Sequence, residues 1–455
     1  MKPIKHAFWG TLVILALLWW LAEPLSLFRA QNFIQYRAVL MQLTGVLAIG
    51  SMSVAMMLAV RPRWPERRLG GLDKMYRLHK WFGISALSFA VMHWVLSNAP
   101  KWAVQLGLME PRQRSPRAPG AEQVQMTVET FLRSYRKLAE SVGEWSFYAA
   151  IILLCLALIR SFPYRLFYKT HRILALSYLA LVFHAVILIN YADWATPLGL
   201  VMALMLITGS YCALVLLFRR AGKSRQVTGK LVSTQVYPGV KSLEMKIAMP
   251  ASWPGHKPGQ FAFIMTAPSE GPHPFTIASD WDPSDRHITV IAKELGDYTN
   301  GLQDRLTIGQ DVRIEGPYGC FTFDDACPTQ IWISGGIGIT PFIGEIQHIV
   351  RKQAETKRPD PRAIHLFHSS STYDEDAFTK LIAIAEKAGI NLTVMVDSRG
   401  GPLTGETIRQ SVPQWKGASI WFCGPVGFGD VLIKDFAAHG FDVDRHFHRE
   451  LFSMR

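Results

Sequence analysis

Long apolar runs fill the first half of the chain and are absent from the second. They cover 7–28, 36–60, 79–98, 143–160, 171–192 and 196–218. A helix of about 20 apolar residues crosses the hydrocarbon core of a bilayer, and each run is about that long, although 143–160 is short. After Arg225 the sequence changes to short alternating strands, Gly/Pro turns and charged helices. The pattern therefore predicts six membrane helices within residues 1–220 and a soluble part after them. Because Lys2 and Lys5 precede the first run and no small-residue cleavage site follows it, we expect a retained anchor.

The soluble part has two textures. From 226 to 325, short alternating segments predict the strands of a small barrel: GKLVSTQV, KSLEMKIAM, QFAFIMTA, HPFTIAS, HITVIAKEL and QDVRIEGPYG. From 329 onward, apolar strands alternate with helices: QIWISGG, a helix from Pro341, AIHLFHS, a second helix, NLTVMV and SIWFCGP. Such alternation predicts a parallel α/β sheet of the nucleotide-binding type.

Basic residues crowd three segments: the links at 61–80 and 160–172, and the segment at 219–225 that links the sixth run to the soluble part. With six spans, all three links and the N-terminus lie on one side, which the positive-inside rule assigns to the cytoplasm. The basic loop at 99–141 opposes this assignment, but it is long and also contains four glutamates, so it weighs less. The net charge of +13 therefore reflects topology, and no aromatic-plus-basic pattern indicates nucleic-acid binding.

Four histidines stand within the apolar runs. His79 and His93 share the third run, and His171 and His184 share the fifth. Ionisable side chains in a membrane span are costly, so by default they indicate function. Two helices with two histidines each can hold two haems one above the other, with one imidazole from each helix on each iron. The alternative is four unrelated polar residues of the helix core.

The spacing of these histidines supports two stacked sites. Fourteen residues of helix rise about 21 Å and return to within about 40° of the starting face, so His79 and His93 lie on one stripe. Thirteen residues rotate by roughly 220°, so His171 and His184 need a bend or an irregular first turn to face one partner. Both spans run outward from the cytoplasm, which predicts an inner pair, His79 with His171, and an outer pair, His93 with His184. Basic residues at the inner level (Arg77, Lys80 and Arg172) either meet haem propionates or extend to lipid headgroups.

Two segments of the soluble part suggest cofactor contacts. Between Ser334 and Pro341 a strand ends, glycines permit close backbone approach, and a helix begins whose N-terminal amides suit a pyrophosphate. In HPFTIAS, Pro274 restrains the backbone before Thr276, and the hydroxyls of Thr276 and Ser279 are candidates for polar contacts to a cofactor. Each segment by itself also fits an ordinary tight turn or strand end.

Taken together, the chain resembles the ferric reductase / NADPH oxidase superfamily over nearly its whole length. The histidine spacings of fourteen and thirteen, HPFT, the segment KELGDYT, GGIGITP, CGP and the terminal FHRELFSMR resemble that family's motifs in the family's order. The resemblance implies a multi-domain membrane protein: a six-helix transmembrane domain with two b-type haems at 1–224, an FAD-binding β-barrel at 225–325, and an NAD(P)-binding α/β domain like that of ferredoxin reductases at 326–455.

The resemblance also implies roles for individual residues. Haem iron is expected at His79, His93, His171 and His184. FAD is expected at His273, Pro274, Phe275, Thr276, Ser279, Lys293, Gly296 and Thr299. The nicotinamide nucleotide is expected at Gly335, Gly336, Gly338, Thr340, Pro341, Cys423, Gly424 and Pro425. Phe452 is expected to cover the flavin, and Phe452 and Cys423 are the catalytic candidates, with Cys423 a nicotinamide neighbour rather than a nucleophile because no histidine partner is evident.

The implied activity carries electrons from cytosolic NAD(P)H through FAD and two haems to an acceptor outside. Oxygen is the favoured acceptor, and a ferric chelate or a partner protein are the alternatives. Oxidases of the family place a histidine one turn beyond the outer ligand of the third span, where this chain has Ser97. Family grounds favour NADPH, whereas the acidic run Asp374, Glu375 and Asp376 after the second α/β strand opposes a 2′-phosphate. No CxxC occurs, so neither an iron–sulfur cluster nor a zinc site is expected.

Overall fold

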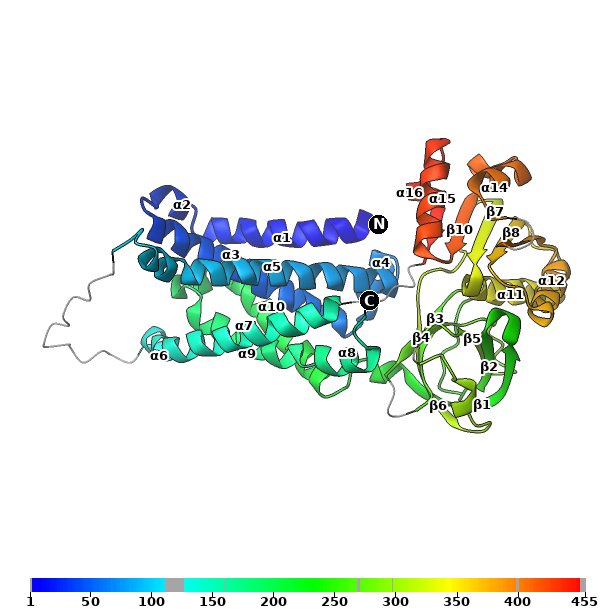
Figure 1. Ribbon diagram of the computed structural model, residues 1–455, viewed down its shortest axis with the longest axis horizontal. Coiled ribbons are helices and arrows are strands. Elements are labelled where there is room, and N and C mark those ends of the chain that lie inside the picture. The colour runs from blue at the N-terminus through cyan, green and yellow to red at the C-terminus, as the bar shows by residue number, and fades with distance from the viewer. Residues whose placement is uncertain are drawn as a thin grey trace, which may run out of the picture. The chain divides into compact units, whose positions relative to one another are not determined.

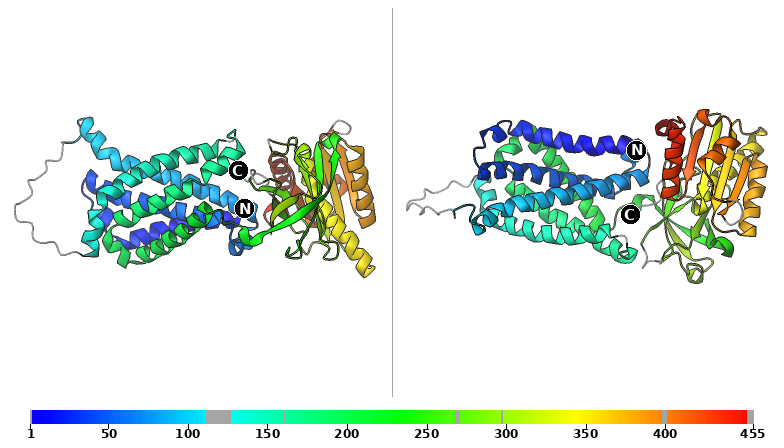
Figure 2. Two further views of the ribbon diagram at one scale, coloured as in Figure 1. Left: turned by 90° about the horizontal axis from the view of Figure 1, so that it is seen from below. Right: turned by 45° about the horizontal axis from the view of Figure 1, so that its top comes forward.

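The computed structural model describes residues 2–110, 127–159, 161–267, 271–296, 298–397 and 401–450. The chain divides into two compact units. The helical unit comprises Met1–Pro65 and Met75–Ala221, and the sheet-containing unit comprises Glu66–Lys74 and Gly222–Met454. Figures 1 and 2 show long helices in the first unit and both sheets in the second.

Six helices of the described chain are long and apolar enough to cross a membrane, which confirms the predicted number. They are α1 (Lys2–Ala22), α3 (Phe33–Ala59), α5 (Leu72–Gln105), α7 (Arg136–Leu158), the segment Leu166–Leu188, and α10 (Pro197–Leu217). Three short helices connect them: α2 (Ser26–Arg29), α4 (Arg63–Leu69) and α6 (Val128–Ser134). Residues 143–158 of the short apolar run are only the later part of α7, which begins at Arg136 and is long enough to span.

The fifth span is interrupted close to its start. Helix α8 (Tyr164–His171) ends at the first histidine of this span, and α9 (Leu174–Leu188) begins three residues later. In between, the backbone N–H groups of Ile173 and Ala175 bond carbonyls three residues back, at 2.9 and 3.1 Å. Bonds of this kind tighten the helix to about three residues per turn. This is the irregular turn that the thirteen-residue spacing requires.

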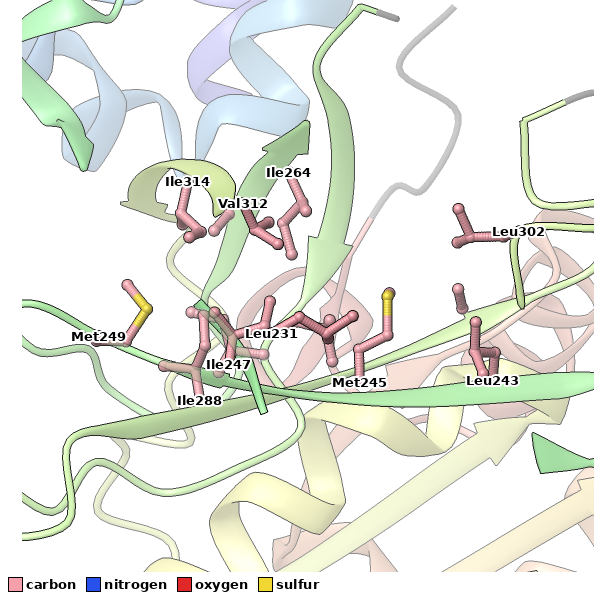
Figure 3. Close-up of a cluster of buried hydrophobic side chains, with 14 of the residues drawn as sticks. Leu231, Leu243, Met245, Ile247, Met249, Ile264, Ile288, Leu302, Val312 and Ile314 are labelled. Atoms are coloured by element: carbon pink, nitrogen blue, oxygen red, sulfur yellow. The ribbon is translucent and has the colours of Figure 1, made fainter. Parts of the chain in front are cut away.

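A six-stranded antiparallel sheet forms the first half of the second unit, in the order β4-β3-β6-β1-β2-β5. Its strands are β1 (Gln226–Tyr237), β2 (Ser242–Ala248), β3 (Phe261–Met265), β4 (His273–Thr276), β5 (His287–Lys293) and β6 (Asp311–Tyr318). A bridge between Ile277 and Val290 joins the two edges, so the sheet closes on itself as the predicted barrel. Alternate residues of β2, such as Leu243, Met245 and Ile247, point into the barrel core shown in Figure 3.

A five-stranded parallel sheet forms the other half, in the order β11-β10-β7-β8-β9. Its strands are β7 (Thr329–Gly335), β8 (Ala363–Ser370), β9 (Asn391–Val396), β10 (Ser419–Cys423) and β11 (Phe447–Arg449). Its helices are α11 (Thr340–Thr356), α12 (Glu375–Ala388), α14 (Gly405–Ser411), α15 (Val426–Ala438) and α16 (Val443–His446). Strand β11 falls in the terminal FHRELFSMR segment, which the sequence pattern did not mark as a strand.

Helices cover both faces of the parallel sheet. Trp332 of β7 points to the core made with Phe342 and Ile346 of α11. Its neighbours Ile331 and Ile333 point to the opposite core, which includes Leu432 and Phe436 of α15. Both faces being buried explains why these strands read as continuous apolar runs. The predicted fold class is confirmed.

Candidate functional site

The four histidines of the helical unit form two facing pairs. The ring centres of His79 and His171 are 6.0 Å apart, and those of His93 and His184 are 6.3 Å apart. The ring planes cross at 73° and 81°. His79 and His93 come from α5, His171 ends α8, and His184 lies in α9. The structure thus brings together the two pairs expected from the sequence.

Three of the four imidazoles are oriented by backbone carbonyls. The Nδ1 atoms of His79, His93 and His184 lie 2.9, 3.0 and 2.8 Å from the carbonyl oxygens of Ala55, Met41 and Ala139. A carbonyl only accepts, so each Nδ1 carries the proton and each Nε2 has a free lone pair. This is the tautomer in which imidazole binds a metal.

The pairs have the dimensions of a site for an iron with two axial imidazoles. Two metal–imidazole bonds of about 2 Å each, added to the distance from each ring centre to its nitrogen, give a separation of about 6 Å. In the described part of the chain no cluster of three or more His, Cys, Asp or Glu side chains is arranged for a metal ion. Haem fits two protein ligands because its macrocycle supplies the remaining ones, so the residues present fit the group.

The flavin motif lies on β4, an edge strand of the barrel sheet. His273 stacks on Tyr298 with ring centres 3.6 Å apart, and burial, followed by the nearby Arg305 charge, lowers the pKa of His273 to about 4. Pro274 and Phe275 pair with Phe263 and Ala262 of β3. The Thr276 hydroxyl is buried and has no hydrogen-bond partner among the described residues. A buried polar group of this kind requires a partner, and this requirement is compatible with the expected flavin contact.

Ser279 and the segment Lys293–Thr299 (KELGDYT), both expected to contact FAD, have structural contacts of their own. The Ser279 hydroxyl accepts the Thr289 N–H at 3.0 Å, which ties the segment after β4 to β5. The Thr299 hydroxyl accepts the N–H groups of Leu295 and Gly296 at 2.9 and 3.2 Å and so closes this loop. Lys293 ends β5 and approaches the glycine loop, since its Nζ would lie 3.7 Å from a Cβ placed on Gly336.

The two nucleotide motifs meet at the carboxyl ends of β7 and β10. A Cβ on Gly338 would lie 2.1 Å from the Cys423 carbonyl oxygen, and one on Gly424 would lie 3.0 Å from the Gly335 nitrogen. The two chain segments therefore approach so closely that they favour glycine at both positions, whether or not a ligand is bound. Beyond them, Gly336 has a φ of +54°, and the buried Thr340 and Pro341 begin α11. The helix N-terminus thus faces the carboxyl edge of the sheet, where α/β folds bind nucleotides.

The two catalytic candidates differ in what the structure describes. Cys423 is completely buried, and burial, with the nearby Glu450 carboxyl, raises the pKa of its thiol well above the usual value. A thiolate nucleophile is therefore disfavoured at this position. Phe452 lies outside the described residues.

Three residues near this site were not anticipated: His368, Gly344 and His256. His368 on β8 is buried with its Nδ1 2.9 Å from the Ser334 hydroxyl, and burial, followed by the Lys293 charge, lowers its pKa to about 4. His368 and Lys293 line a cavity of about 390 Å³ between the barrel and the parallel sheet. A Cβ on Gly344 of α11 would lie 3.2 Å from the Ser279 carbonyl oxygen, so this glycine lets α11 approach the flavin segment. A glycine inside a helix costs about 1 kcal/mol of stability relative to alanine. The presence of Gly344 within a helical sequence was therefore the one signal that could have indicated this close approach.

His256 also contacts this segment. Its Nε2 lies 2.8 Å from the carbonyl oxygen of Ser279, so the ring supports the backbone beside the flavin motif. The sequence around His256, WPGHKPGQ, gives no local pattern that identifies this contact.

Together the two units define a class: an integral membrane protein that joins a helical domain to a reductase domain of the FAD- and NAD(P)H-binding type. Comparison with known proteins agrees in both parts. Residues 44–182 match the family described as ferric reductase like transmembrane component, and residues 227–322 match an FAD-binding domain. The chain belongs to the ferric reductase / NADPH oxidase superfamily.

Three relatives illustrate the match. An NADPH oxidoreductase of Mycobacterium tuberculosis is 30% identical over 36% of this chain and 43% of its own. Respiratory burst oxidase homolog protein G of Arabidopsis thaliana is 29% identical over 42% of this chain and 24% of its own. Ferric reduction oxidase 4 of the same plant is 36% identical over 24% of this chain and 16% of its own. The chain thus spans less than two thirds of the length of each relative.

Proposed function

We propose that the protein moves electrons across a membrane, from NAD(P)H through FAD and two haems to an acceptor on the opposite side. The observation that carries the proposal is the pair of facing histidines repeated at two levels of α5 and α8–α9, in one chain with a flavin and nucleotide fold. The His79–His171 and His93–His184 pairs would each hold one haem iron. With two protein ligands on each iron, such haems would relay electrons rather than bind a substrate.

We place the second unit in the cytoplasm on the basis of charge. The basic residues at 61–80, 160–172 and 219–225 fall on one side of a six-span topology. The His79–His171 pair then lies at the inner level and the His93–His184 pair at the outer level.

The chain's own residues bind and orient the cofactors. The N-terminal amides of α11 and the glycines before it receive the pyrophosphate of the nicotinamide nucleotide. Lys293, which the resemblance assigns to FAD, also brings a positive charge close to this glycine loop. Thr276 bonds the flavin, and the four histidines hold the irons. When bound, FAD would supply the means to accept a hydride from NAD(P)H and to release single electrons, and the haems would supply one-electron carriers; this redox chemistry belongs to the cofactors. The fixed tautomers of His79, His93 and His184 keep each Nε2 directed to its iron.

We propose oxygen as the acceptor, with superoxide as the product. Ser97, which stands where oxidases of the family have a histidine, favours a second candidate, reduction of a ferric chelate. One purified preparation of the full chain distinguishes them when NAD(P)H is supplied with oxygen or with a ferric chelate. Superoxide that depends on oxygen supports the first, and chelate reduction without oxygen supports the second. Reduced haems with neither product indicate transfer to a partner protein.

The haem assignment has its own test. A fully loaded preparation should contain two haems per chain, and His93→Ala should lose one of them while NAD(P)H still reduces the flavin. A single haem in the wild-type chain contradicts the four-ligand proposal.

For the electron donor we propose NADPH, on family grounds. Asp374, the first residue of the acidic run, has its carboxylate engaged by the N–H groups of Gly239 at 2.8 Å and Ala377 at 3.1 Å. This engagement supports the proposal, because a carboxylate bound by two backbone donors opposes a phosphate less strongly than a free one. The ratio of kcat/KM for NADPH and NADH measures the preference, and a clear preference for NADH overturns it.

A further inference from the structure

The histidines of the outer pair, His93 and His184, rest against glycines of neighbouring helices. A Cβ placed on Gly45 of α3 would lie 3.3 Å from Cε1 of His93. A Cβ placed on Gly143 of α7 would lie 2.0 Å from Nδ1 of His184. Real Cβ atoms do not approach a ring to 2.0 Å, so His184 holds its position only because residue 143 has no side chain.

Each of these glycines is paired with the carbonyl that accepts the imidazole proton. His93 Nδ1 bonds the carbonyl of Met41, and His184 Nδ1 bonds that of Ala139. In both helices the carbonyl precedes the glycine by four residues, which is the spacing of the helical N–H to C=O bond. The ring therefore reaches a carbonyl already bonded along the helix axis, and the missing side chain at the glycine opens the way to it.

A further contact fixes α3 against α5 beside this site. Arg37, four residues before Met41, donates from Nε to the Leu96 carbonyl at 2.6 Å and from Nη2 to the Ser97 carbonyl at 3.1 Å. Arg37, Met41 and Gly45 thus form one face of α3, and this face contacts α5 at His93 and one turn beyond it.

The inner pair lacks this arrangement. His79 bonds the carbonyl of Ala55, but the residue four positions later is Ala59 and not glycine. His171 Nδ1 has no hydrogen-bond partner among the described residues, and its ring stacks on Phe167 with centres 4.9 Å apart. The two levels therefore hold their imidazoles in different ways.

We propose that two carbonyl–glycine pairs, Met41–Gly45 and Ala139–Gly143, set the ring plane and the tautomer of the outer ligand pair. We call these pairs seats; in each, the glycine follows the carbonyl residue by four positions. Gly45 and Gly143 are thus positioning residues for the outer haem. The inference rests on the proposed function, since it concerns how a haem-ligating pair is oriented. The alternative is that these glycines serve only close helix packing, which is common in membrane helices.

The test is a series of Gly→Ala substitutions in the full chain, with a matched control. Gly83 of α5 has no atom within 4 Å of a built Cβ, so Gly83→Ala adds the same methyl without a clash. We expect Gly83→Ala to leave both haems unchanged, Gly45→Ala to shift the spectrum of one haem, and Gly143→Ala to shift it more strongly or to lose that haem. The readouts are haem content, the low-spin EPR signals, which report the angle between imidazole planes, and two-component redox titration.

The outcomes separate this inference from the proposed function. If the wild-type chain does not bind two haems, or His93→Ala and His184→Ala lose none, the proposed function fails. If it binds two, and Gly143→Ala has the spectra of Gly83→Ala, the seats are overturned. If Gly143→Ala loses both haems and its FAD, the chain has misfolded, and Gly45→Ala decides: a change confined to the His93–His184 haem supports the seats, and no change overturns them.

Discussion

An ion pair that joins the flavin segment to the nucleotide helix offers a quantitative test of how the second unit is held together. Asp280 follows the β4 motif by four residues, and its side chain is 10% exposed. Its carboxylate accepts from Nδ1 of His348 at 2.9 Å and from Nε of Arg351 at 2.5 Å, both on α11. Burial alone raises the pKa of Asp280, but the hydrogen bonds from His348 and Arg351 outweigh it and lower this pKa to about 2. The perturbation is Asp280→Asn, which keeps the shape and removes the charge.

Two routes give a similar magnitude. A shift of the Asp280 pKa from 3.8 to about 2 corresponds to about 2 kcal/mol of folding free energy, at 1.36 kcal/mol per unit. Hydrogen bonds to charged groups contribute about 1.5–3 kcal/mol each. The lower end applies here, because Arg351 is 32% exposed and keeps a second carboxylate, that of Glu355 at 2.7 Å. We therefore expect a loss of about 2–3 kcal/mol, or a fall in Tm of roughly 4–12 °C for a unit of this size.

The assay is the release of FAD fluorescence on heating the purified full chain. The sign of the pH dependence follows from a lowered pKa: the stabilisation is complete above about pH 4 and is lost as the pH falls from there towards 2. The difference between wild type and Asp280→Asn should therefore be constant from pH 6 to 8. Asp285→Asn is the control, since this carboxylate of the same barrel is 58% exposed. Equal melting of Asp280→Asn and wild type refutes the reasoning.

Three further predictions concern buried groups of the same unit. Burial, followed by the Asp73 charge, raises the pKa of Glu450 to about 8, so the folded state loses stability as the pH rises from about 4.5 through 8. The melting temperature of Glu450→Gln should therefore match that of wild type at pH 5 and exceed it at pH 9. Because burial raises the thiol pKa of Cys423, maleimide should label this thiol more slowly than that of the half-buried Cys327. Peptide mass spectrometry measures both labelling rates, and faster labelling of Cys423 would contradict its burial. In Gly338→Ala the new Cβ would lie 2.1 Å from the Cys423 carbonyl oxygen, so we expect the nucleotide site to be displaced by about an ångström. Flavin reduction by NAD(P)H, measured by stopped flow, should then slow by at least about tenfold. Gly427→Ala, whose Cβ meets no atom within 4 Å, should leave this rate unchanged.

Local pattern was sufficient to predict most of the fold. The six spans follow from the length of the apolar runs. The strands of the parallel sheet follow from shorter apolar runs bounded by glycine and proline. The break between α8 and α9 was predicted from the histidine spacing alone, because thirteen residues of regular helix cannot present His171 and His184 to one partner. Strand β11 was missed, because three residues, Phe447–Arg449, give no period to recognise.

The contacts that assemble the nucleotide site could not be predicted, because they join residues distant in sequence. GGIGITP was interpreted as a loop opened for a ligand, yet Gly338 is required by the approach of the Cys423 carbonyl. Gly344, just beyond this motif, is in tight contact with the Ser279 carbonyl. A glycine in a sequence indicates that something comes close and does not identify what comes close. The Ser334–His368 contact is of the same kind, since it depends on β7 and β8 being neighbours in register, with Ser334 opposite His368.

The two features of the helical unit that local rules disfavour explain each other. Pro100 lies inside α5 and lacks an N–H, so the carbonyl four residues earlier, that of Leu96, has no helical donor. Arg37 stands in the apolar helix α3, where a charge is costly unless it is bonded. Its guanidinium donates to the Leu96 carbonyl, so the arginine satisfies the group that the proline leaves open. Replacing Pro100 by alanine restores the helical bond and leaves Arg37 with a competitor for that carbonyl. Pro100 and Arg37, each unfavourable alone, thus form one contact between α5 and α3, one turn beyond His93. At this level the seats of the outer pair require α3 and α5 to keep a fixed separation, and this contact holds it.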